Sequence, residues 1–117
     1  MGAERFVDAV YVAVYQTAIH GVLENLVEPP GRRPRQDLVD LSSWFNGLDQ
    51  DGRDRVMEVV RYPVDGAVFG MLAALDGVRA LGLDGELSLS VNGLEIAPDQ
   101  ELHATFRSLV DEELGRD

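Results

Sequence analysis

The stretch VDGAVFGMLAALDGVRA, Val64 to Ala80, decides the fold. Its apolar residues recur at helical spacing, and it lies inside a longer segment, Arg53 to Leu81, for which we predict one long helix. Gly66, Gly70 and Gly77 share one face of that helix, although each glycine inside a helix costs roughly 1 kcal/mol relative to alanine. Close approach of another backbone would offset this cost. We therefore predict a central helix, largely shielded from water, whose glycine face is a candidate interface.

Pro63 lies in the interior of this predicted helix. Proline has no N–H to donate, and its ring clashes with the preceding turn, so the helix is expected to bend or stop there. The sequence leaves two alternatives open, one kinked helix or two shorter helices.

Three further helices are predicted from the spacing of apolar residues. The first runs from about Ala3 to Val27 and ends at a cluster of breakers that begins at Pro29. The second runs from about Gln36 to Gly47. The last follows Pro98 and reaches about Leu114, with four apolar residues facing inward: Leu102, Phe106, Leu109 and Val110.

A β-hairpin is predicted at about residues 86–97, immediately before the last helix. Leu87, Leu89 and Val91 alternate with serines, and Asn92-Gly93 suits the positive φ angles of a two-residue type I′ turn. The expected fold is mainly α (α+β): a compact bundle of four to five helices with one C-terminal hairpin, in a single domain over residues 1–117.

Charge and composition limit the classes of function. Ten Lys and Arg against 21 Asp and Glu give a net charge of −11, which disfavours nucleic acid and anionic membranes as partners. The absence of cysteine excludes disulfides and thiol catalysis. Because Glu4 and Asp8 interrupt the N-terminal segment and no basic leader precedes it, we expect a cytoplasmic protein.

Familiar catalytic motifs are missing from the sequence, including a phosphate loop, a nucleophile elbow and a dinucleotide fingerprint. His20, Glu24 and Glu28 follow one another at four-residue intervals, as metal ligands on a helix can. No second histidine is near, so a solvated polar stripe is the preferred interpretation. We expect no catalytic residue, no metal and no cofactor.

Four charged residues in the predicted central helix form a candidate cluster: Arg61, Asp65, Asp76 and Arg79. Charges on an apolar helix usually occur in pairs, so the preferred hypothesis joins Arg61 to Asp65 and Asp76 to Arg79. The alternative is a pocket in which the two carboxylates act as acid and base or hold a metal, while Arg79 binds an anionic group.

Trp44 is the only tryptophan and a candidate interface residue, together with the three glycines. Its polar neighbours Ser42, Ser43 and Asn46 are compatible with either of two environments. A place in the core is the preferred interpretation, and a partly exposed anchor at a protein interface is the alternative.

Three segments together resemble an uncharacterised family of small bacterial proteins: LSSWFNGL from Leu41, VDGAVFG from Val64 and LDGVRA from Leu75. The segments EPPGR from Glu28 and LHATF from Leu102 also fit, so the likeness covers most of the chain. Tyr62-Pro63 departs from the pattern, because such relatives have a plain helix there. The resemblance implies no established activity.

Size and charge favour a non-enzymatic protein-binding domain, an immunity-like or regulatory partner that attracts a basic protein through its acidic surface. One alternative is a small enzyme or ligand-binding domain that uses Asp65, Asp76 and Arg79. Another is a structural homodimer closed by the hairpin edge or the glycine face.

Overall fold

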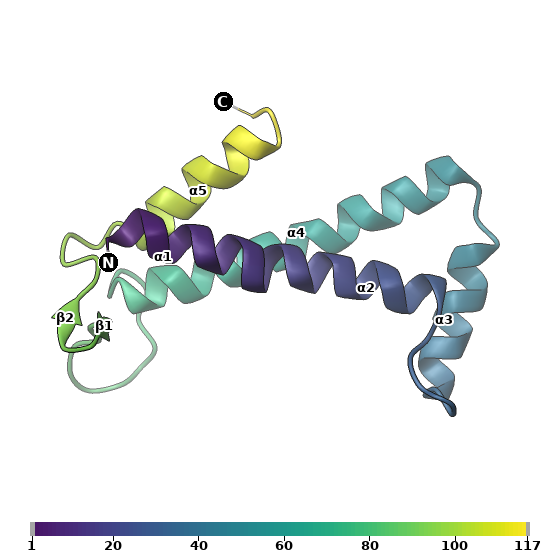
Figure 1. The fold of residues 1–117 in the computed structure, drawn as a ribbon, viewed down its shortest axis with the longest axis horizontal. Helices are drawn as coiled ribbons and strands as arrows, with labels where there is room; N and C mark the ends of the chain where they lie inside the picture. Colours follow the sequence, from purple (N-terminus) through teal and green to yellow (C-terminus); the bar gives the residue numbers. More distant parts are fainter. Residues whose placement is uncertain (1, 117) are drawn as a thin grey trace. The chain divides into compact units, whose positions relative to one another are not determined.

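The computed structural model describes residues 2–116. The chain is mainly helical, with one two-stranded antiparallel hairpin before the last helix (Figure 1), which confirms the predicted fold class. Internal contacts divide the chain into two compact units. Unit 1 holds the residues up to Val14 and those from Gly66 onward, and unit 2 holds Tyr15–Asp65.

The first predicted helix is present over its full length but is not α-helical throughout. The α-helices α1 (Ala3–Val10) and α2 (Thr17–Val27) are joined end to end by η1 (Tyr11–Gln16), a π-helix. A π-helix uses i→i+5 hydrogen bonds and has no distinctive sequence pattern, so the sequence did not predict it.

Residues 3–27 form a helix that is long and apolar enough to cross a membrane by length and composition. Its most apolar 18-residue window has a mean hydropathy of 1.3, and 22% of that window is buried. Core helices of soluble proteins and signal sequences meet the same criteria. The cytoplasmic location therefore stays a prediction.

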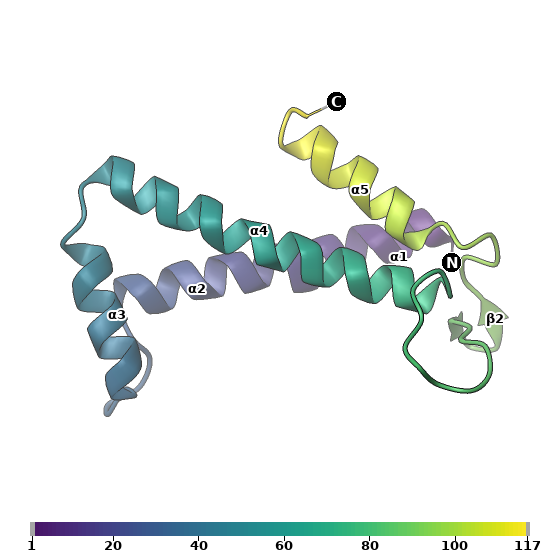
Figure 2. The ribbon, with the colours of Figure 1, turned by 180° about the vertical axis from the view of Figure 1, so that it is seen from behind.

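Unit 1 has its core where α1 packs against α5 (Leu102–Glu113), and Figure 2 shows the two helices from behind. Leu102, Phe106 and Val110 recur every four residues on α5 and are almost completely buried, as predicted. Val7 of α1 and Ile96 after the hairpin are also buried in unit 1.

The long helix α4 (Gln50–Leu75) is continuous through Pro63, so the proline does not split it. Its first turn is capped by Asp49, whose side chain accepts the N–H of Gly52 at 2.8 Å. The helix begins three residues before the expected Arg53.

The expected end of this helix at Leu81 is wrong, because Gly77 terminates it. Gly77 has a φ of 78° and donates its N–H to the carbonyl of Ala74, while Val78 donates to Ala73. These two bonds form a Schellman motif, which satisfies the last carbonyls of a helix and favours glycine at the left-handed position.

The expectation that little of α4 faces water is also wrong. Val68, Leu72, Ala73 and Ala74 are buried, whereas Met71 is 61% exposed and Tyr62 is 84% exposed. One stripe of the helix packs inward, and the apolar residues outside that stripe remain on the surface.

The hairpin consists of β1 (Ser90–Val91) and β2 (Leu94–Glu95), with Ser90 opposite Glu95 and Val91 opposite Leu94. Asn92 and Gly93 form the predicted two-residue turn, with φ angles of 53° and 82°. Regular pairing covers two residues of each strand, so the ladder is shorter than the alternating sequence suggested.

Unit 2 is built on α3 (Gln36–Asn46), which packs against α2. The carbonyl of Val27, the last residue of α2, accepts hydrogen bonds from Ser42 Oγ at 3.4 Å and Asn46 Nδ2 at 3.0 Å. Phe45, on the same face of α3, is 1% exposed. These contacts fix the inward face of α3 and leave its opposite face to solvent.

Candidate functional site

Asp76 is buried and acts as the cap of α5. Its Oδ1 accepts the N–H of Leu102 at 3.2 Å, and its Oδ2 accepts the N–H of His103 at 2.9 Å. His103 Nδ1 also contacts this second oxygen. The carboxylate therefore satisfies the free N–H groups at the start of a helix, a role that residues before the helix usually fill.

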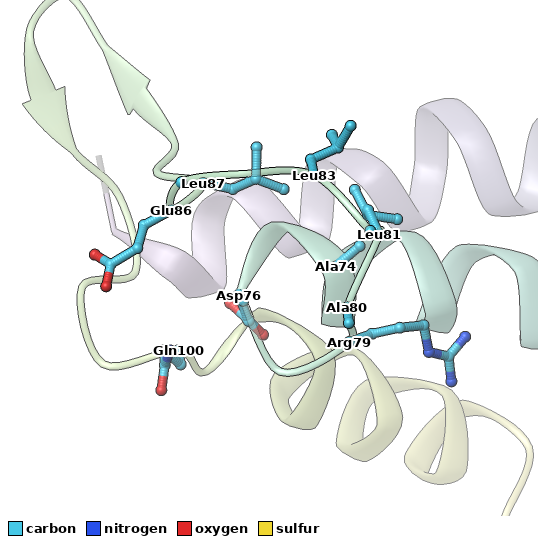
Figure 3. Close-up of a pocket in the computed structure, with 12 residues that line it drawn as sticks. Ala74, Asp76, Arg79, Ala80, Leu81, Leu83, Glu86, Leu87 and Gln100 are labelled. Atoms are coloured by element: carbon cyan, nitrogen blue, oxygen red, sulfur yellow. The ribbon is translucent and has the colours of Figure 1, made fainter.

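The predicted pair of Asp76 with Arg79 is not formed, because Asp76 bonds α5 instead. The guanidinium of Arg79 lies against Gly70, where an added Cβ would come within 2.4 Å of its Nη1. Figure 3 shows the Arg79 side chain extending away from the Asp76 carboxylate. Gly70 thus makes room for an arginine side chain and not for another backbone, which corrects the expected reason for this glycine.

The other predicted pair is also absent from residues 2–116, since no salt bridge joins Arg61 to Asp65. Asp65 is 9% exposed in unit 2, and Arg61 is half-buried in the same unit. The four-residue cluster therefore does not exist as two ion pairs.

A cavity of about 420 Å³ in unit 1 is lined by Asp76 and Arg79, two of the four cluster residues (Figure 3). The rest of its wall comes from the end of α4, Gln100 and the loop before the hairpin, where Leu81, Leu83 and Leu87 are exposed. This partly agrees with the alternative hypothesis of a pocket. However, the Asp76 carboxylate is already bonded to three groups, which leaves it poorly placed to act as a base.

Within the described residues, no group of three or more His, Asp or Glu side chains could hold a metal ion. Among residues 2–116, the cavity walls of the two units hold no histidine beside a serine or threonine.

Trp44 is 54% exposed, so the preferred interpretation of a core tryptophan is wrong. It lies on the outer face of α3, one turn from Leu41, which is 47% exposed. The neighbouring Phe45 and Ser42 take the inward positions, so the face of α3 that carries Trp44 is left to solvent. The exposure of Trp44 agrees with the alternative hypothesis, and its role as an anchor at a protein interface stays a prediction.

Two carboxylates share this outer face, because Asp37 and Asp40 precede Trp44 by seven and four residues. Asp37 accepts two hydrogen bonds from the guanidinium of Arg35, which hold the pKa of its carboxyl below the ordinary value. Asp40 accepts a hydrogen bond from Gln36 Nε2 at 2.8 Å. We call Asp37, Asp40, Leu41 and Trp44 the α3 face.

The glycines of the candidate interface have different environments. Gly66 has no atom within 4 Å of an added Cβ, and Gly77 is required by its positive φ. Neither meets the backbone of another element, so a close helix contact does not explain either glycine. The homodimer hypothesis stays a prediction.

Sequence reasoning missed the cap of α5 and the contacts of His103, whose ring also meets Phe69 edge-on at 5.6 Å. Nothing in the spacing of the sequence pointed to an aspartate so far upstream as the cap of this helix. No protein-family model, curated protein or solved structure matches the chain.

Proposed function

We propose that this chain is a non-enzymatic protein-binding domain whose α3 face docks on a basic partner protein. The observation that carries the proposal is the exposure of Trp44 next to Leu41. Tryptophan is enriched among the residues that dominate binding energy, and an exposed one flanked by another apolar side chain resembles the centre of an interface.

The charges around Trp44 define the chemistry of the partner. Asp37 and Asp40 place carboxylates on the same helical face as the indole ring, and the chain as a whole carries a net charge of −11. An arginine of the partner could stack on the indole while its N–H groups reach a carboxylate, a combination that suits a planar guanidinium. The overall charge would speed the approach of a basic protein.

The packing of α3 on α2 also supports a binding role for the α3 face. In the free chain, α3 is held on α2 by hydrogen bonds from Ser42 and Asn46 to Val27 and by the burial of Phe45. A preorganised face loses little conformational entropy on binding.

We also propose that the chain belongs to the uncharacterised bacterial family that its segments resemble, and that it acts in the cytoplasm. Neither proposal adds an activity. Both are consistent with a role as the acidic partner of a basic protein. That role is inferred from the size and charge of the chain.

Affinity capture from the lysate of the native host, at low and high salt, tests the proposed function. The wild-type chain is compared with Trp44→Ala, Asp40→Asn and the control Tyr62→Ala, which removes another exposed aromatic of unit 2. A basic protein retained at low salt by the wild type and Tyr62→Ala, but lost with Trp44→Ala, supports the proposal. Equal retention by all four proteins, or capture that salt does not weaken, would overturn it.

A further inference from the structure

The cavity between the three helices of unit 2 has an arginine in its wall. It measures about 280 Å³ and is lined from α2, α3 and the start of α4. Leu23, Val27, Phe45 and Met57 supply apolar surface, and Arg53 supplies a positive charge. Asn46, Gln50 and Asp54 complete the wall. Apolar surface with a few polar or charged groups is typical of sites for small molecules.

Arg53 is held in place but its hydrogen-bonding capacity is not used up. Its Nη2 donates to the carbonyl of Asn46 at 2.8 Å, and its guanidinium carbon lies 6.0 Å from the centre of the Phe45 ring. Its Nε is buried and has no hydrogen-bond partner. A buried donor without a partner costs about 1–3 kcal/mol, so such a group calls for a ligand or another explanation.

No carboxylate within residues 2–116 neutralises this arginine. The one acidic residue in the cavity wall is Asp54, whose Oδ1 accepts a hydrogen bond from Gln50 Nε2 at 2.8 Å. By contrast, the neighbouring Arg55 forms a salt bridge with Glu58.

From this geometry we infer that the cavity binds a small monocarboxylate with an apolar body. The carboxylate accepts hydrogen bonds from the guanidinium of Arg53, which presents its donors in a fork that matches two carboxylate oxygens. The apolar body lies against Leu23, Phe45 and Met57. A volume slightly below the usual range of about 300–1,000 Å³ for ligand sites limits the ligand to a short chain or a single ring.

Nuclear magnetic resonance titration of the full chain with sodium hexanoate tests this inference. Hexan-1-ol has the same body without the charge, and hexylammonium reverses the charge. We expect hexanoate to shift the Met57 methyl signal saturably and to leave that of Met71, which lies in unit 1, in place. Binding of hexan-1-ol as tight as that of hexanoate, or a larger shift at Met71, would overturn the inference.

Substitutions of Arg53 test whether this residue binds the carboxylate of hexanoate. Arg53→Gln should weaken hexanoate binding at least about tenfold, because a hydrogen bond to a charged group is lost. The matched control Arg55→Gln should leave the affinity unchanged. Arg53→Lys keeps the charge without the fork of donors and should give an intermediate affinity. If Arg53→Gln does not fold, Arg53→Lys provides the test. Affinity unchanged in both Arg53 variants would contradict the inferred site.

Discussion

Asp76 and His103 join the end of α4 to the start of α5. The Asp76 carboxylate accepts the backbone N–H of His103 at 2.9 Å and also contacts Nδ1 of its ring. The pair lies at the edge of the unit 1 core, because Leu102 on one side and Phe106 on the other are buried. Asp76, named from the sequence as a candidate acid or base, therefore helps to hold the scaffold together.

Asp76→Ala should destabilise the protein by about 1–2 kcal/mol or more, because it removes a helix cap and leaves two N–H groups without an acceptor. Urea unfolding measures the change. Asp99→Ala, which removes an exposed acid from the segment before α5, is the control and should change the free energy of unfolding by less than about 0.5 kcal/mol. Equal effects of the two variants would show that Asp76 is not the cap.

Two glycine substitutions in and after α4 should have opposite signs. Gly66→Ala adds a Cβ where no atom lies within 4 Å, so it should stabilise the helix by about 0.5–1 kcal/mol. Gly77→Ala forces a left-handed φ on alanine and should destabilise by about 1–2 kcal/mol. Thermal unfolding of both variants checks the prediction, and a destabilised Gly66→Ala would instead indicate a contact on that face, as in the homodimer hypothesis.

The carboxyl of Asp37 should titrate at a lower pH in the folded protein than in the unfolded chain. Arg35 is the cause, through its hydrogen bonds to the carboxylate and its charge. The stabilising effect of the pair is fully present above the unfolded pKa and is lost as the pH falls through the folded pKa. It should be small because the pair is exposed.

Carbon-detected magnetic resonance of the Asp37 carboxyl measures this pKa directly. Arg35→Gln should raise the midpoint toward the unfolded value, and Arg55→Gln, a change at a separate salt bridge, should not move it. A midpoint that does not respond to Arg35→Gln would show that the pair does not persist in solution.

The chain should not bind phospholipid vesicles, although residues 3–27 are apolar enough to span a membrane. A net charge of −11 repels anionic headgroups, and Glu4, Asp8 and Glu24 lie within the apolar helix. Co-sedimentation with anionic and with neutral vesicles tests this prediction. Recovery of the chain in the pellet with neutral vesicles would contradict it and point to insertion of the helix.

Local patterns predicted much of the fold. The Asn92-Gly93 turn and the inward stripe of α5 depend on neighbouring residues, and both were predicted correctly. The end of α4 was misplaced because Gly77 was counted as part of a helical face, although glycine after an aspartate also suits a helix terminus.

The candidate site was harder to predict because it depends on contacts between distant residues. Asp76 finds its partners 26 and 27 positions along the chain, so a search for neighbouring charges led to Arg79 instead. For Trp44, the polar neighbours were compatible with the core or with the surface, and the packing of α3 on α2 with Phe45 inward decided it.

The fluorescence of Trp44 gives the most direct test of the central claim, because it is the only tryptophan and lies on the α3 face. The full chain is titrated with the purified basic protein obtained by capture. Any tryptophan of that protein is first replaced, so that the emission comes from Trp44 alone. The account predicts a saturable shift in emission as the indole is buried, weakened by salt. A complex that forms while the Trp44 emission stays unchanged would contradict it.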